Sequence, residues 1–141
     1  MRDIRIAAAQ FETRENDRAY NLGRIGELTA RAVGQGAEIV SFHEVCIPGY
    51  SWMQPLGPDE LRALAEPVPD GPSTQELIEI ARAHGAIVMA GLLERGPGEA
   101  VYNSYVAVSA DGLLARHHKL HPFINPHLTP GEGYTVFEAR G

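Results

Sequence analysis

Three short, largely apolar segments, separated by two stretches of helical periodicity, constrain the fold of this chain most strongly. The apolar segments lie at residues 4–11, 37–42 and 86–93. Their length and composition are typical of strands buried on both faces of a sheet. Between them, apolar residues recur at helical spacing over residues 17–33 and 73–84. This β-α-β-α-β order needs crossover connections, so it predicts parallel or mixed pairing of the first strands.

Local signals predict where the two helices begin and end. Thr13 and Asn16 are candidate N-caps of the first helix, because their side-chain oxygens can accept hydrogen bonds from backbone N–H groups. The Gly-Gln-Gly run at 34–36 predicts its end. For the second helix, the Ser-Thr-Gln-Glu run at 73–76 fits a capping box, and Gly85 predicts the stop.

The pattern changes after the third strand. Residues 101–109 and 113–120 are expected to be two strands joined by an Ala-Asp-Gly turn at 110–112, which predicts an antiparallel hairpin. Residues 135–138 are expected to form a last short strand. The fold class is therefore α/β, with a mixed β-sheet and two main helices on one face. Because the strands are apolar on both faces, the other face also needs a cover, and we expect that layer to be missing from this chain.

The composition limits the class of partner. A chain of 141 residues, 44% of them hydrophobic, can form one domain with its own core. Its 18 Asp and Glu against 12 Lys and Arg argue against nucleic acid, since phosphate binding needs clustered positive charge. No apolar run approaches the roughly 20 residues that span a bilayer, and no signal peptide is expected. The single cysteine, Cys46, suits a reducing compartment, so we expect a cytoplasmic protein with no membrane partner.

Glu44 is the first residue that could carry chemistry. It follows the second apolar segment, and α/β folds usually place their sites at the carboxyl ends of strands. A partly buried carboxylate there can act as a general base. The alternative is a surface glutamate that caps a turn at the strand end.

Lys119 lies near the end of the second hairpin strand, where its ammonium could stabilise a developing oxyanion. The alternative is an exposed edge-strand lysine that discourages aggregation. The neighbouring histidines suggest a metal site. In a strand, His117 and His121 face the same side as Lys119, and His118 faces the other. An ammonium between two ligands would repel a cation, and no carboxylate or cysteine completes a site at the usual spacing, so we expect no metal.

Cys46 could be a nucleophile. It lies two residues after Glu44, so in an extended segment both side chains would face one way, and a thiol beside a base can be activated. However, it is flanked by Val45 and Ile47, and lone cysteines are usually buried as small apolar residues. We favour the buried role and keep a thiol site of Cys46, Glu44 and a histidine as an alternative hypothesis.

The loop at 47–72 is rich in Pro and Gly, with one helical turn expected near Pro58. We expect it to shape the entrance of a pocket. Tyr50 and Trp52 could line that pocket, and packing is the alternative that we favour for Trp52.

Several short motifs occur in order along nearly the whole chain. They are Ile-Ala-Ala-Ala-Gln at 6–10, Phe-His-Glu at 42–44 leading into Pro-Gly-Tyr at 48–50, Tyr-Asn-Ser at 102–104, Arg-His-His-Lys-Leu-His at 116–121, and Pro-Gly-Glu at 130–132 before Tyr-Thr-Val-Phe at 134–137. Each motif is weak alone. The ordered set resembles the N-terminal half of the nitrilase superfamily of carbon–nitrogen hydrolases.

The resemblance implies a four-layer αββα sandwich, of which this chain supplies about half, in subunits that pack into dimers and larger assemblies. It implies that Glu44 is the general base and that Lys119 stabilises the tetrahedral intermediate, while a cysteine thiolate attacks the carbonyl or nitrile carbon. It implies no metal and no organic cofactor. The family cysteine follows the Tyr-Thr-Val-Phe region, so the nucleophile is expected to be absent from the chain, which ends at Gly141. Cys46 is at the wrong motif position to replace it.

Many members of this family carry a second catalytic glutamate seven or eight residues after the lysine. Pro126 and His127 occupy those positions here, and we expect His127 to be a possible pocket residue. Glu132 is the nearest acidic candidate, although it aligns better with the Pro-Gly-acid turn. The substrate therefore stays open among amides, N-carbamoyl compounds and nitriles.

Two main hypotheses follow for function. In the first, residues 1–141 are a truncated carbon–nitrogen hydrolase domain whose missing half lies on another chain or has been lost from the gene model or the expressed sequence. In the second, they are a catalytically inactive half-domain that serves as an assembly or binding module. Either one leaves a large apolar face exposed, so we expect homo-oligomers or pairing with a C-terminal half, and no hydrolysis by this chain alone.

Overall fold

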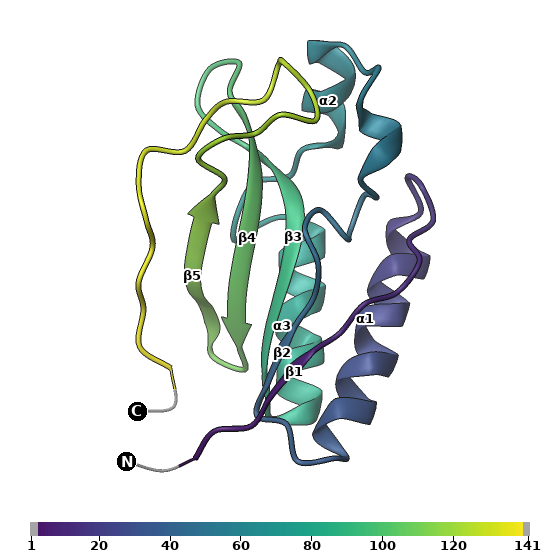
Figure 1. The fold of residues 1–141 in the computed structure, drawn as a ribbon, viewed down its shortest axis with the longest axis vertical. Helices are drawn as coiled ribbons and strands as arrows, with labels where there is room; N and C mark the ends of the chain where they lie inside the picture. Colours follow the sequence, from purple (N-terminus) through teal and green to yellow (C-terminus); the bar gives the residue numbers. More distant parts are fainter. Residues whose placement is uncertain (1–2, 140–141) are drawn as a thin grey trace.

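The five strands of the sheet follow one another in space in the order of the sequence. The computed structural model describes residues 3–139, and its strands are β1 (Ile6–Ala8), β2 (Ile39–Ser41), β3 (Ile87–Arg95), β4 (Val101–Ser109) and β5 (Gly112–His118). β1, β2 and β3 pair in parallel, whereas β3, β4 and β5 pair antiparallel (Figure 1). The predicted change from parallel to antiparallel pairing is confirmed, and so is the hairpin between β4 and β5.

Two long helices, α1 (Arg18–Val33) and α3 (Pro72–His84), cover one face of this sheet (Figure 1). The predicted pair of main helices on one face is therefore confirmed. The helices and the sheet enclose one apolar cluster, whose fully buried members include Ile25, Val40, Leu77, Val88, Val106 and Val108. Each such aliphatic side chain contributes about 1.5–3 kcal/mol on burial, which makes this cluster the main source of stability.

A smaller apolar cluster lies at one end of the molecule. It contains a 3₁₀ turn (Ser51–Met53) and the helix α2 (Pro58–Leu64), so the helical turn predicted near Pro58 is present. Its buried members are Val45, Met53, Leu61, Ala65, Leu93, Val101 and Leu128. This cluster holds the segment that follows β2 against the end of β3. Among the described residues, no helix has the length and apolar character needed to cross a membrane.

The N-cap of α1 differs from the prediction. Asp17 fills this position, and its carboxylate accepts a hydrogen bond from the backbone N–H of Tyr20 (3.0 Å). Neither Thr13 nor Asn16 does so. Asp17 lies directly before the first helical residue, which is where a short side chain reaches the free N–H groups of the first turn.

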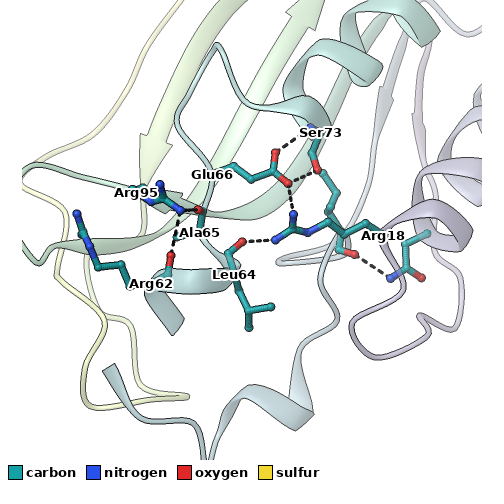
Figure 2. Close-up of polar contacts among 9 residues, drawn as sticks. Arg18, Arg62, Leu64, Ala65, Glu66, Ser73 and Arg95 are labelled. Atoms are coloured by element: carbon teal, nitrogen blue, oxygen red, sulfur yellow. Dashed lines mark hydrogen bonds and ion pairs between the residues drawn. The ribbon is translucent and has the colours of Figure 1, made fainter. Parts of the chain in front are cut away.

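Glu66 provides the acceptor at the start of α3. It is 6% exposed and accepts hydrogen bonds from the backbone N–H and the hydroxyl of Ser73 at 2.8 and 2.7 Å (Figure 2). Ser73 lies inside the first turn, because α3 begins at Pro72, so the predicted capping box at 73–76 is wrong. The guanidinium of Arg18, the first residue of α1, donates to the same carboxylate at 2.8 Å. Glu66 therefore ties both helices to the segment after α2.

Glu66→Ala is expected to lower the free energy of unfolding by about 3 kcal/mol, because it leaves buried donors of Ser73 without an acceptor and removes the partner of Arg18. Denaturation by urea, followed by circular dichroism, measures this change. Glu99→Ala is the control, because the Glu99 side chain is 90% exposed and its ion pair with Arg62 is long, at 3.9 Å. We expect the control to stay within about 0.5 kcal/mol of wild type, and equal losses for the two variants would contradict the anchoring role of Glu66.

The face of the sheet opposite α1 and α3 carries no helix within the described residues (Figure 1). Ile6 in β1 is 62% exposed as a result. The prediction that the first strand is buried on both faces is therefore wrong, because β1 is an edge strand with one face uncovered.

The strand predicted at 135–138 does not form in the described structure. The segment runs along β5 in an extended path (Figure 1), and the hydroxyl of Thr135 donates to the carbonyl of Arg116 at 3.1 Å. Tyr134 and Val136 are 91% and 94% exposed, so the apolar side chains of this segment have no layer to pack against.

Candidate active site

A sharp turn after β2 carries Glu44. Val45 has a φ of +47°, a left-handed conformation that is rare for a β-branched residue. The turn rests directly on Gly91 of β3, where a Cβ atom would lie 2.2 Å from the Val45 nitrogen. The backbone N–H of Ile47 also donates to the Gly91 carbonyl at 3.1 Å. Glycine at position 91 therefore lets the turn lie on the strand and holds Glu44 close to β4 and β5.

Lys119 approaches Glu44 from the end of β5. Its Nζ lies 2.7 Å from Oε1 of Glu44, although the two residues are far apart in sequence. The backbone of Lys119 is fixed on both sides, because its N–H donates to the carbonyl of Asn103 and its carbonyl accepts from the N–H of Gly131, each at 2.9 Å. The structure thus brings together the two residues that the sequence singled out for catalysis.

Asn103 is a third member of this group. Its Nδ2 donates to Oε1 of Glu44 at 2.6 Å, and the residue is 4% exposed. Asn103 belongs to the Tyr-Asn-Ser motif at 102–104, but no role was predicted for it from the sequence. Its position in β4 could have indicated this role, because strand alternation places Asn103 on the same face of the sheet as Lys119 after β5. Both donors use Oε1, and among the described residues no hydrogen bond reaches Oε2, which leaves that oxygen able to accept a proton.

These side chains open into a cavity of about 230 Å³. It is lined by Glu44, Asn103, Tyr105, His117 and Lys119. The side chains of Glu44 and Lys119 are 38% and 30% exposed, so solvent reaches the ion pair. An ion pair this exposed adds at most about 1 kcal/mol to stability. The two charges are thus accessible to a small molecule and contribute little to folding.

The comparison with known proteins identifies the family. The carbon–nitrogen hydrolase family model matches residues 5–140. This chain belongs to the carbon–nitrogen hydrolase family. The match confirms the resemblance drawn from the ordered motifs and the α/β fold class with it.

Relatives in this family are amidases and nitrilases. A nitrilase of Pyrococcus abyssi is 28% identical over 96% of this chain and 51% of its own length. An omega-amidase of Danio rerio is 31% identical over 98% of this chain and 51% of its own. The crystal structure of a carbon–nitrogen hydrolase superfamily protein from Xanthomonas campestris covers 100% of this chain, with 25% identity and a TM-score of 0.81, and 51% of that protein is matched. The chain therefore spans about half the length of the relatives that it matches.

The predicted pocket residues lie outside the lining of this cavity. Tyr50 packs against the smaller apolar cluster, and the pKa of its phenol is raised by burial first and by the Glu44 carboxylate second, while Lys119 opposes the shift. The indole N–H of Trp52 donates to the Pro48 carbonyl at 2.9 Å, and its ring packs against the smaller apolar cluster. His127 is exposed. Trp52 thus has the packing role, and none of the three residues lines the cavity of Glu44 and Lys119.

Cys46 is buried in the main apolar cluster of the chain. It is 0% exposed, and burial raises the pKa of its thiol to about 11. An extended segment would place the side chains of Glu44 and Cys46 on the same side, as predicted from the sequence. The turn at Val45 interrupts this alternation, so the two side chains face different ways. A thiol in this environment stays protonated near neutral pH, which fits the role of a buried apolar residue.

The neighbouring histidines separate as strand alternation predicts. His117 lines the cavity beside Lys119, whereas His118 contacts Glu94 on the opposite face of the sheet. Glu132, the nearest candidate for a second catalytic glutamate, lines a different cavity, together with Glu94 and His118. Among the described residues, no group of three or more His, Cys, Asp or Glu is arranged to hold a metal ion.

Proposed function

We propose that residues 1–141 form a carbon–nitrogen hydrolase domain that supplies the general base and the oxyanion-stabilising cation for hydrolysis of a non-peptide C–N bond. The substrate class is an amide, an N-carbamoyl compound or a nitrile. The observation that carries this proposal is the convergence of Lys119 and Asn103 on one oxygen of Glu44, at 2.7 and 2.6 Å, in an accessible cavity. The amidase and nitrilase relatives support the reaction class.

Glu44 serves as the base in this scheme. With Oε1 held by Asn103 and Lys119, its Oε2 takes the proton of a cysteine thiol. The thiolate forms a C–S bond with the substrate carbon, and the π electrons of the carbonyl or nitrile move onto its heteroatom. With an amide or N-carbamoyl compound, the C–N bond of this adduct then breaks, and Glu44 returns the proton to the leaving ammonia or amine. With a nitrile, Glu44 first returns the proton to the nitrogen, which gives a thioimidate, and one water adds to the thioimidate carbon before the C–N bond breaks and ammonia leaves. Both routes end at a thioester. Glu44 then takes a proton from the water that hydrolyses the thioester.

Lys119 stabilises the charge that develops on the substrate. Its ammonium already lies at the mouth of the cavity and carries three donors, of which Glu44 uses one. A second donor can reach the oxyanion of the tetrahedral intermediate. A fixed cation in a partly desolvated site stabilises such a charge more than it does the neutral substrate.

The nucleophilic cysteine comes, in this proposal, from polypeptide outside residues 1–141. Cys46 is the single cysteine of the sequence and is buried. The amidase of Nesterenkonia provides a parallel, since acrylamide adds to its active site cysteine. The same additional polypeptide would cover the open face of the sheet and exposed apolar residues such as Ile6, Tyr134 and Val136. A C-terminal half is therefore the partner proposed for this chain, with assembly into oligomers.

Ammonia release tests the proposal. We expect the complete protein, meaning the product of the whole reading frame that contains residues 1–141, to release ammonia from at least one member of a panel of amides, N-carbamoyl compounds and nitriles. The isolated 141-residue chain should release none above the blank, because it lacks the nucleophile. Turnover by the isolated chain would contradict the assignment of the nucleophile. A folded complete protein that is inactive on the whole panel would favour the inactive assembly or binding module instead.

A further inference from the structure

A second buried carboxylate, Glu94, lies on the face of the sheet opposite the candidate active site. It belongs to β3 and is 3% exposed. Its Oε2 accepts from the hydroxyl of Ser104 at 2.7 Å and from Nε2 of His118 at 2.9 Å, and its Oε1 accepts from Arg116 at 2.8 Å. Because a carboxylate only accepts, Nε2 of His118 carries the proton. Glu94 thus connects three adjacent strands through side chains on one face.

The donors to Glu94 are the sequence neighbours of the donors to Glu44. Ser104 follows Asn103 in β4, and His118 precedes Lys119 at the end of β5. Ser104 and His118 are also partners in the strand register. Since successive strand residues point to opposite faces, the same pair of strands presents one pair of donors to each carboxylate. Any shift of β5 relative to β4 would alter both groups of contacts together.

His118 is held by further contacts at the strand end. Its ring stacks on Tyr102 with centroids 3.9 Å apart and planes 3° apart. Gly131 packs so closely that a Cβ atom there would lie 2.2 Å from the His118 carbonyl oxygen. Without such contacts, the last residue of an edge strand would fray, because it has few ladder hydrogen bonds. Lys119 is the residue directly after this fixed point.

We propose that Glu94 is a positioning residue that fixes the end of β5 through His118 and thereby sets the position of the Lys119 ammonium against Glu44. The catalytic consequence rests on the proposed function, whereas the structural consequence does not. A displacement of about 1 Å at a reacting group costs about 100-fold in rate, so a clamp that prevents it has a measurable effect.

Glu66 provides a matched control for this proposal. It is a buried carboxylate with three hydrogen bonds or ion pairs from protein donors, as Glu94 is, but its donors are Arg18 and Ser73 of the helices. Replacing either glutamate with glutamine removes a buried negative charge that accepts three hydrogen bonds or ion pairs. The backbones of the two glutamates form a β-bridge, but only the Glu94 side chain contacts β4 and β5, which lead to Lys119.

Kinetics of the complete protein test the catalytic consequence. We expect Glu94→Gln to lower kcat by about 100-fold with KM nearly unchanged, and Glu66→Gln to leave kcat close to wild type in the folded fraction. In a Lys119→Ala background, Glu94→Gln should cause no further loss, because Glu94 acts through Lys119. An unchanged kcat for Glu94→Gln, or an equal further loss without Lys119, would overturn the proposal. His118→Ala, which keeps Glu94 paired with Arg116 and Ser104, replaces Glu94→Gln if that variant does not fold.

Hydrogen exchange in the complete protein tests the positioning itself. The backbone N–H of Lys119 donates to Asn103, and the N–H of Ala9 donates to Ser41 at the far side of the sheet. We expect Glu94→Gln or His118→Ala to speed exchange at Lys119 by about 10-fold or more and to leave Ala9 unchanged. Equal protection of Lys119 in wild type and variants would refute the clamp. This readout does not depend on turnover. If the complete protein had no hydrolase activity, the proposed function would be contradicted, but the exchange rates would still show whether Glu94 fixes the end of β5.

Discussion

Replacing Glu44 with glutamine in the complete protein is expected to reduce kcat/KM by about 10³-fold or more. Glutamine keeps the shape of the side chain and one acceptor oxygen for Asn103 and Lys119, which contact Oε1 in the wild type. It cannot take a proton, so both deprotonation of the thiol and activation of water lose their base. General acid–base catalysis contributes about 10²–10⁴-fold per step, which sets the size of the loss.

The control for this variant is Glu99→Gln, because Glu99 has a side chain that is 90% exposed and lies outside the cavity. Steady-state ammonia release at saturating and limiting substrate gives the two rate constants. We expect Glu99→Gln to match wild type. If Glu44→Gln kept half of the wild-type rate, Glu44 would not be the base.

Replacing Lys119 with alanine is expected to reduce kcat/KM by about 10²–10³-fold, the usual effect of removing one donor to an oxyanion. Lys119 is the single lysine among the 141 residues, and the other 11 residues of the Lys and Arg total are arginines. Loss of the ion pair should change the free energy of unfolding by less than about 1 kcal/mol, since both side chains are about one-third exposed. The rate loss would then reflect chemistry rather than unfolding.

Lys119→Arg separates charge from geometry. Arginine keeps the positive charge, but its planar guanidinium is larger and cannot occupy the position of a compact ammonium 2.7 Å from Glu44. We expect Lys119→Arg to keep less than about a tenth of the wild-type kcat/KM. Full activity in Lys119→Arg would mean that any positive charge near the cavity is sufficient for catalysis. It would contradict the proposal that Nζ of Lys119 donates a hydrogen bond to the oxyanion.

The succession of strands and helices along the chain was predictable because it depends on local patterns. Period and composition identified the three apolar segments and the hairpin, and the parallel-to-antiparallel change followed from the connections between them. The helix starts were less accessible. Ser73 satisfies the local rule for a cap, but its donors go to Glu66, which arrives from another segment. A rule confined to four residues cannot detect such a partner.

The site was predictable only in part, for the same reason. Glu44 and Lys119 stood out through the motifs around them, and the structure places them in contact. The contribution of Asn103 depends on its register opposite the end of β5, and the burial of Cys46 depends on the turn at Val45. Long-range register and a residue in a left-handed conformation leave little trace in local sequence.

The uncovered face of the sheet was also not predicted for β1 from local sequence. Strand composition predicted that β1 would be covered on both faces, and Ile6 is instead largely exposed. Residues 3–139 do not themselves form the layer that this apolar pattern predicts. In the proposed function, additional polypeptide supplies it.

Mass spectrometry of the acyl-enzyme intermediate identifies the nucleophile that Glu44 and Lys119 are proposed to serve. The complete protein would be mixed with a member of the amide, N-carbamoyl and nitrile panel that it hydrolyses, quenched in acid during turnover and analysed by peptide mapping. The account predicts an acyl group on a cysteine outside residues 1–141, less of it in Glu44→Gln, and none on the buried thiol of Cys46. An acyl group on Cys46, or turnover with no cysteine adduct in any peptide, would contradict the claim that Glu44 and Lys119 serve a nucleophile from outside this part of the chain.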